Sequence, residues 1–103
     1  MATMKEKIIE IAEHYGYDSQ SRQLVEEMAE LMVALNKAWR GREHFSASEK
    51  RKVRKQIVEE IADVEIMLEQ IKHIIDCDGE VFLTKMRKVD RQIERMHDDE
   101  KPM

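Results

Sequence analysis

The segment Leu24–Leu31 reads LVEEMAEL, and 33 residues later the segment Ile57–Val64 reads IVEEIADV. Apolar, acidic and small residues occupy the same positions in the two segments. Apolar residues that recur at steps of three and four line one face of a helix, so both segments predict amphipathic helices. If these helices pack antiparallel, as a short connection favours, matching residues face one another across a pseudo-twofold axis.

The composition of the whole chain agrees with a helical fold. A length of 103 residues accommodates one domain, and we expect it to span residues 1–103. Three glycines and one proline leave little turn material for a sandwich, a barrel or a glycine-rich nucleotide loop. Charged residues make up 39% of the chain, and straight-chain helix formers dominate. The composition therefore predicts an all-α domain.

Local signals divide the chain into four predicted helices. Two capping boxes, each a hydroxyl residue followed three positions later by Glu, begin at Thr3 and Ser46. Gly16 is a natural C-cap for the first helix, and Asp78-Gly79 breaks the chain before the last one. We expect helices at about 3–16, 18–40, 46–76 and 80–96, followed by a frayed tail at 97–103.

The third predicted helix is apolar on more than one side. One seam runs from Ile57 to Ile75 at steps of three and four, and Val58, Ile66 and Ile74 lie off it. Such a helix is buried on more than one side, and in a short chain the second partner is most simply another subunit. We expect a four-helix bundle-like domain with two long antiparallel central helices, assembled as a homo-oligomer. A monomer with a wide core stripe is the alternative.

Charge and cysteine content limit the partners and the compartment. A net charge of −4 is opposite to that of a protein whose main role is coating nucleic acid or an anionic membrane. Cys77 is the only cysteine, which excludes an internal disulfide and suits a reducing compartment. No apolar run approaches the roughly 18 residues of a membrane span. We expect a cytoplasmic protein with no membrane partner.

One basic run, at residues 50–55, stands out against the acidic balance. It reads KRKVRK and opens the third predicted helix, at the wrong end of the helix macrodipole for local stability. Because no aromatic residue is interleaved with it, we interpret it as a solvated face or a contact for an acidic partner or another subunit, and expect no nucleic-acid partner.

The acidic residues of the repeat lie beside the predicted core face. Glu27 and Glu30 are one turn apart on one flank of the second helix, and Glu60 and Asp63 hold the matching positions on the third. Four carboxylates that converge at low dielectric repel one another strongly. A hard divalent cation with oxygen ligands, such as Mg²⁺, offsets that repulsion. The alternative is a solvated acidic edge on each helix, and spacing alone does not decide between the two.

The acidic pattern resembles that of a known family. Glu26-Glu27-x-x-Glu30 followed by Glu60-x-x-Asp63 is similar to the E-E-x-x-E…E-x-x-D motif of the MazG-like all-α nucleoside triphosphate pyrophosphohydrolases. Supporting similarity to short, single-domain members covers segments 15–20, 34–37 and 59–70 and, more loosely, Lys85, Met86, Val89 and Arg91. The resemblance extends over about residues 8–93.

This resemblance implies an activity and a metal site. Members hydrolyse a (deoxy)nucleoside triphosphate to the monophosphate and pyrophosphate with Mg²⁺ or Mn²⁺, in house-cleaning or nucleotide-pool control, and are usually dimers or tetramers. Residue by residue, the implied metal ligands are Glu27, Glu30, Glu60 and Asp63. Glu27 and Glu60 also count as catalytic, and Glu26 is a candidate for orienting the attacking water, with a plain surface role as its alternative.

Candidate substrate contacts are a separate set. Lys37 has no acidic residue four positions earlier to pair with, Trp39 offers a surface for stacking a base, and Gln20 offers an amide for a base or sugar. Lys85 and Arg91 match basic positions of the short family members; for all five, a structural or solvated role is the alternative. At the level of the whole protein, the alternatives are a non-enzymatic helical interaction module and a regulator that binds nucleotide without turnover.

Overall fold

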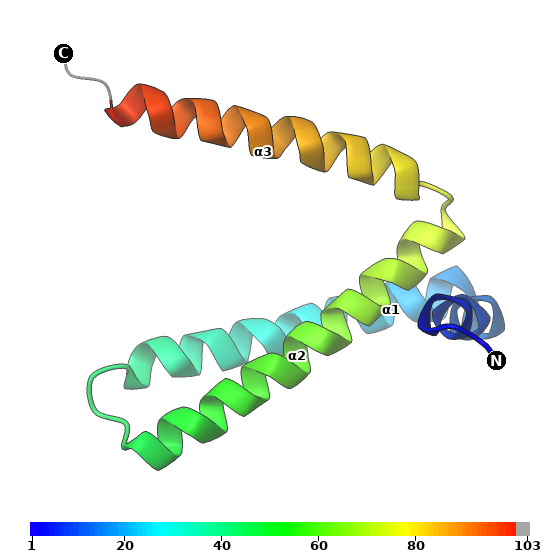
Figure 1. Cartoon of the computed structure of the whole chain (residues 1–103). Helices are drawn as coiled ribbons and strands as arrows, with labels where there is room; N and C mark the ends of the chain where they lie inside the picture. The colour runs from blue at the N-terminus through cyan, green and yellow to red at the C-terminus, as the bar shows by residue number, and fades with distance from the viewer. Residues whose placement is uncertain (101–103) are drawn as a thin grey trace.

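The computed structural model describes residues 1–100, and they form three helices and no strand (Figure 1). Helix α1 spans Met4–Gly41, α2 spans Ala47–Ile74 and α3 spans Asp78–Glu100. The predicted all-α class is therefore confirmed. Among these residues, no helix is both long enough and apolar enough to cross a membrane.

Both predicted capping boxes are present. The Thr3 hydroxyl accepts a hydrogen bond from the Glu6 backbone N–H at 3.1 Å, and the Glu6 carboxylate accepts one from the Thr3 N–H at 3.2 Å. The same reciprocal pair joins Ser46 and Glu49, at 3.1 and 3.4 Å. Each cap satisfies donors that a helix start leaves free, which contributes about 1 kcal/mol to stability.

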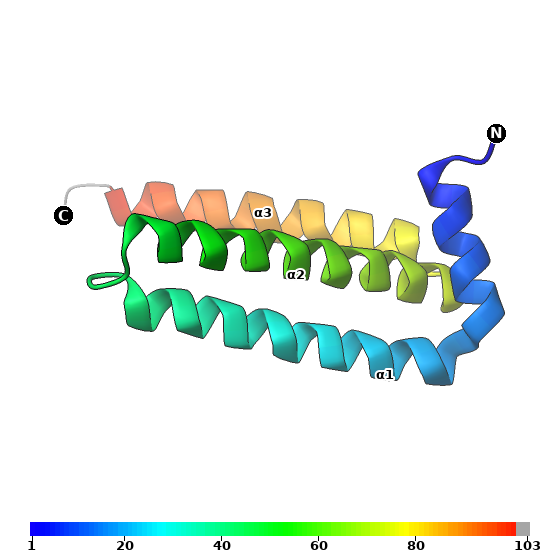
Figure 2. The ribbon, with the colours of Figure 1, turned by 90° about the horizontal axis from the view of Figure 1, so that it is seen from below.

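Gly16 divides α1 into two helical parts that meet at a kink. Its φ of 82° and ψ of 177° lie in a region that is essentially open to glycine alone. Residues 4–15 form an N-terminal arm that turns away from the rest of α1 (Figure 2). The predicted break therefore falls at the correct residue, and the first two predicted helices are the two parts of α1.

Residues 17–41 of α1 and the whole of α2 form an antiparallel hairpin, which Figures 1 and 2 show side by side. Ala34 and Val53 are buried between the two helices near the turn, and Met67 is buried near the opposite end. The turn is tight because the Phe45 ring lies against Gly41, where a Cβ atom would collide with it. Phe45 and His44 also donate backbone hydrogen bonds to the Gly41 carbonyl, at 2.8 and 3.1 Å.

A buried pair of amides joins the hairpin at the end away from the turn. The Gln20 Nε2 atom donates a hydrogen bond of 2.7 Å to Oε1 of Gln70. The two residues are only 6% and 1% exposed, and 50 positions separate them in the sequence. A buried polar pair favours one alignment of the two helices, because sliding either helix would separate the buried Gln20 donor from the Gln70 acceptor.

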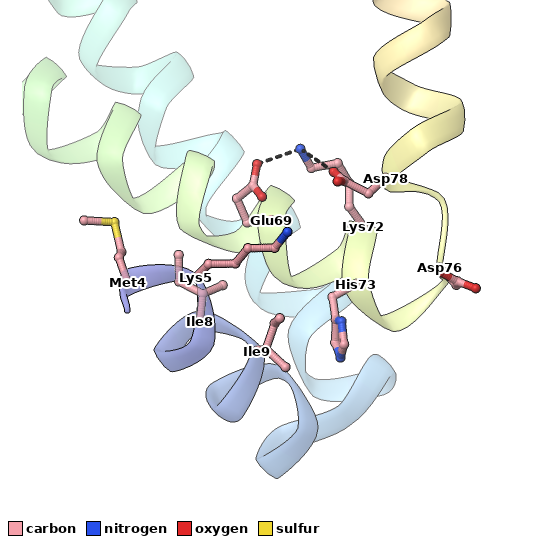
Figure 3. A pocket seen from close by; sticks show the side chains of 9 residues that line it. All are labelled: Met4, Lys5, Ile8, Ile9, Glu69, Lys72, His73, Asp76 and Asp78. Carbon is pink, nitrogen blue, oxygen red and sulfur yellow. Dashed lines mark ion pairs between the residues drawn. The ribbon is translucent and has the colours of Figure 1, made fainter. Parts of the chain in front are cut away.

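Helix α3 leaves the hairpin at a sharp connection. Asp76 adopts a φ of 53°, and Lys72 forms ion pairs with Glu69 at 2.6 Å and with Asp78 at 3.4 Å across the connection (Figure 3). The hydrogen bond to Glu69 is the main cause that raises the pKa of Lys72 above its ordinary value. Beyond its start, α3 stands apart from the hairpin (Figure 1).

The apolar stripe of α3 has no partner within the described part of the chain. No residue of α3 is buried, and its large apolar side chains are 45–61% exposed; they are Phe82, Leu83, Met86, Val89, Ile93 and Met96. The helix also continues past its expected end at Met96 to Glu100, because the sequence contains no helix breaker before Pro102. Residues 101–103 of the expected tail lie outside the described residues.

Candidate metal centre

The hairpin brings three of the four predicted acidic ligands together. Glu27 and Glu30 lie on α1, Glu60 lies on α2, and one carboxylate oxygen from each falls within 4.8 Å of the other two. The cause is the antiparallel packing of the two repeat segments, which places their acidic flanks opposite one another. Oxygen-only groups of this kind are the ligands that Mg²⁺ and Mn²⁺ take in proteins.

Two of the carboxylate oxygens in this cluster have no hydrogen-bond partner. The Oε2 atoms of Glu27 and Glu60 are both buried, and neither accepts a hydrogen bond. The second oxygen of Glu27 accepts a bond of 2.8 Å from the Gln23 amide, which orients that carboxylate. A buried acceptor without a partner is costly. A cation between the helices would satisfy both oxygens, so the residues present fit a divalent metal.

The electrostatics of Glu60 reflect this crowding. Its pKa is raised above 4.5, chiefly because its carboxyl group is partly removed from water. The negative charges of Glu30, Asp63 and Glu27 raise it further, as does a hydrogen bond to Glu30. Without a counter-charge, the charged form of Glu60 is therefore less favoured than that of an isolated glutamate.

Asp63 lies beside the cluster and is not part of it. Its side chain is exposed, and none of its oxygens falls among the carboxylate atoms that lie within 4.8 Å of one another. Its charge is nevertheless close enough to raise the pKa of Glu60. Glu26 is exposed on α1 next to Glu27.

A shallow cavity of about 280 Å³ adjoins the acidic cluster. Glu30 and Glu60 form its acidic side, and Ala29, Val33 and Gln56 complete the lining. Gln56 and Gln23 were not among the residues predicted for the site. The signal was present, because the repeat extends one residue further back, and Gln23 and Gln56 hold matching positions four residues before Glu27 and Glu60. Each glutamine therefore lies on the same helix face as its acid.

The predicted substrate contacts are dispersed over the chain. Gln20 is buried and bonded to Gln70, so its amide faces the hairpin core. Lys37 is exposed on α1, two turns after Glu30, and Trp39 is 65% exposed near the turn. Lys85 and Arg91 lie on α3, away from the acidic cluster of the same chain (Figure 1).

A larger cavity, of about 590 Å³, lies at the end of the hairpin opposite the turn (Figure 3). The N-terminal arm supplies an apolar side that includes Ile8 and Ile9, and Lys72 and His73 of α2 lie across from it. Lys72 is already paired with two acids, and His73 Nε2 lies 3.1 Å from a carboxylate oxygen of Glu13. Lys72 and His73 thus have partners within the chain, unlike the buried oxygens of the acidic cluster.

Comparisons with known proteins leave the site to be interpreted from its own geometry. No protein-family model, curated protein or solved structure matches the chain. We therefore infer the function from the acidic repeat and from the arrangement of its carboxylates in the hairpin.

Proposed function

We propose that the chain is a divalent-metal-dependent nucleoside triphosphate pyrophosphohydrolase. The observation that carries the proposal is the convergence of Glu27, Glu30 and Glu60, with two buried oxygens that lack partners. The resemblance of the acidic repeat to the MazG-like motif supplies the reaction class. The reaction places the oxygen of a water molecule on the α-phosphorus of the substrate, breaks the bond to the bridging oxygen, and releases the monophosphate and pyrophosphate.

The acidic residues have distinct parts in this proposal. Glu27, Glu30 and Glu60 would hold Mg²⁺ or Mn²⁺, and Asp63, whose charge acts on Glu60, would be the fourth ligand. When bound, the metal supplies positive charge for the phosphate oxygens and makes a water molecule more acidic. Gln23 orients Glu27 through its hydrogen bond. Partial burial and the neighbouring acids raise the pKa of Glu60, and a bound cation would favour its carboxylate form.

The rest of the site concerns the substrate. The cavity beside Glu30 and Glu60 is the place for part of the substrate next to the acids, and the Gln56 amide is available there for a hydrogen bond. We assign to Glu26 the orientation of the attacking water, because it is the remaining acid of the first repeat segment, Leu24–Leu31, and is open to solvent.

Homo-oligomer formation belongs to the same proposal. The α3 stripe is apolar and uncovered along its length, and the hairpin also leaves Met28, Leu35 and Ile61 39–48% exposed. Burial of apolar surface contributes about 25 cal/mol per Å², which favours covering both faces in a second copy. Packing α3 on the hairpin of a second copy is also the way in which Lys85 and Arg91 can approach an acidic cluster.

The test is a product assay with matched variants. The protein is incubated with each nucleoside and deoxynucleoside triphosphate and Mg²⁺, and pyrophosphate is distinguished from orthophosphate. We expect pyrophosphate from at least one substrate, and loss of it in Glu60→Gln and Asp63→Asn. Glu65→Gln, an exposed carboxylate on the same helix and outside the cluster, is the control and should retain activity. Orthophosphate as the product, or no product from any substrate, contradicts the proposal.

A helical interaction module without catalytic activity is the second candidate. The uncovered apolar stripe of α3 favours it, because such a stripe suits a partner helix whether or not the acids bind metal. Titration calorimetry with Mg²⁺ and Mn²⁺ separates the two. A cation that binds wild type and not Glu60→Gln supports the enzyme or a nucleotide-binding regulator, and the product assay separates these; no metal binding supports the module.

A further inference from the structure

The turn of the hairpin concentrates positive charge that the chain does not neutralise. Residues 37–55, here called the hairpin tip, contain eight Lys and Arg residues and two Glu residues, a local charge of +6 in a chain of net charge −4. All eight basic residues are exposed. Within residues 1–100, no ion pair joins any of them to an acid. Of the two glutamates, Glu49 is already engaged in the capping box of α2.

The folded tip adds the aromatic group that the basic run lacks in the sequence. Trp39, at the end of α1, is 65% exposed, and the guanidinium carbon of Arg42 lies 3.7 Å from the centroid of its ring. Arg42 is held in place by a hydrogen bond of 2.6 Å from Nη1 to the Trp39 carbonyl. A cation therefore covers one face of the ring, and much of the residue stays open to solvent.

The two helices also enclose a small hollow at the tip. Its volume is about 150 Å³, and an apolar floor that includes Phe45 and Ile57 is bordered by Arg42, Lys50 and Arg54. The basic run thus continues from the first turns of α2, across the hollow, to the arginine that stacks on Trp39. Flat apolar surface and several cations come together here from segments that are separate in the sequence.

The basic run on α2 also acts against local stability. Lys50, Arg51 and Lys52 lie in the first turns of α2, where the helix macrodipole is already positive. Repulsion among these charges and the dipole is relieved when an anion binds. A ligand with many negative charges gains the most, because each contact releases counterions from the ligand.

We propose that the hairpin tip binds single-stranded nucleic acid. Phosphates lie along Arg42, Lys50 and the following basic residues, and an unstacked base packs on Trp39. The aromatic surface distinguishes this partner from a duplex, whose bases are already stacked, and from an acidic peptide, which uses the charges but not the ring. The expectation of no nucleic-acid partner depended on the acidic net charge and on the lack of aromatic residues within the run, whereas the fold gathers positive charge at the tip and places Trp39 against Arg42 there. The inference does not depend on the acidic cluster.

The test is fluorescence anisotropy of labelled strands of about 16 nucleotides, with the full-length protein and salt between about 50 and 200 mM. Oligo-dT and oligo-U distinguish DNA from RNA, and a duplex of equal length is the comparison. We expect at least one single strand to bind more tightly than the duplex. The double variant Lys50→Glu/Arg51→Glu should lower its affinity and reduce the salt slope by about 1.4, about 0.7 for each lost phosphate contact.

Two further variants separate stacking from charge. Trp39→Ala should weaken single-strand binding roughly 5- to 100-fold, leave duplex binding unchanged, and be partly rescued by Trp39→Phe. Arg87→Glu/Lys88→Glu makes the same charge change on α3 and should leave binding unchanged. All substituted residues are exposed, and circular dichroism checks the fold. The proposal is overturned by absence of binding at low salt, by equal losses in both charge-reversal variants, or by an acidic peptide that binds more tightly than either strand.

Discussion

Replacing Gln70 by leucine tests what holds the two halves of the acidic site in alignment. The substitution removes the acceptor of the 2.7 Å bond from Gln20 and leaves the Gln20 Nε2 donor buried without an acceptor. An unsatisfied buried donor costs about 1–3 kcal/mol. The Gln70 amide is 1% exposed and itself has only a weak contact of 3.5 Å to the Met67 sulfur, so little else is lost with it. We expect the free energy of unfolding to fall by about 1–3 kcal/mol.

Thermal denaturation of a double-mutant cycle measures this effect. For a chain of this size, each kcal/mol lowers the Tm by about 4–8 °C. Gln20→Leu/Gln70→Leu should regain much of the loss, because two apolar side chains leave no unsatisfied group. We expect this double variant to bind Mg²⁺ more weakly than wild type even so, because the amide pair no longer selects one register for Glu27 and Glu60. Additive losses in the two single variants would refute the reasoning.

Three further predictions concern the metal, the pH and the bend in α1. Mg²⁺ at a hundred times its dissociation constant should stabilise wild type by about 2.7 kcal/mol and leave Glu60→Gln unaffected, as read from the Tm before and after chelation. Because the pKa of Glu60 is raised above 4.5, the folded protein binds a proton at this carboxyl group more tightly than the unfolded chain does. Without metal, the free energy of unfolding should therefore fall as the pH rises from 4.5 through the raised pKa. Urea denaturation at several pH values should show this fall in wild type and a flatter pH dependence in Glu60→Gln. Gly16→Ala should lower the free energy of unfolding by about 1–3 kcal/mol, and backbone strain is the whole cause, because a Cβ atom there meets nothing within 4 Å. Gly79→Ala in α3 is the control and should be neutral or stabilising in the same denaturation assay.

Features set by neighbouring residues could be predicted from the sequence. The capping boxes at Thr3 and Ser46 form within one helical turn, and the bend at Gly16 follows from the conformational freedom of a single residue. The acidic cluster was also predictable, because an antiparallel pair of matching helices places Glu27 and Glu60 opposite one another without further information.

Features set by distant residues could not be predicted. The Gln20 amide could equally bind a ligand, and only the position of Gln70, 50 residues away, shows that this amide belongs to the core. The direction of α3 is not specified by its own sequence either, because its apolar stripe finds no partner in the described chain. In the same way, the surface around Trp39 exists only after the turn brings the two helix ends together.

The acidic cluster and the basic hairpin tip lie on one hairpin, yet they do not neutralise each other. The nearest basic residues of the tip, Lys37 and Lys55, lie seven positions from Glu30 and five from Glu60, about 10 and 7.5 Å along the helix axis. These separations are comparable with the Debye length of about 8 Å at physiological salt, and within residues 1–100 no ion pair joins the tip to the cluster. The pKa of Glu60 reflects this, because burial and acidic neighbours shift it and no basic residue opposes them. Each cluster of like charges is therefore destabilised by repulsion in the isolated chain. A counter-charge from outside relieves it: a cation between the helices and a polyanion at the turn.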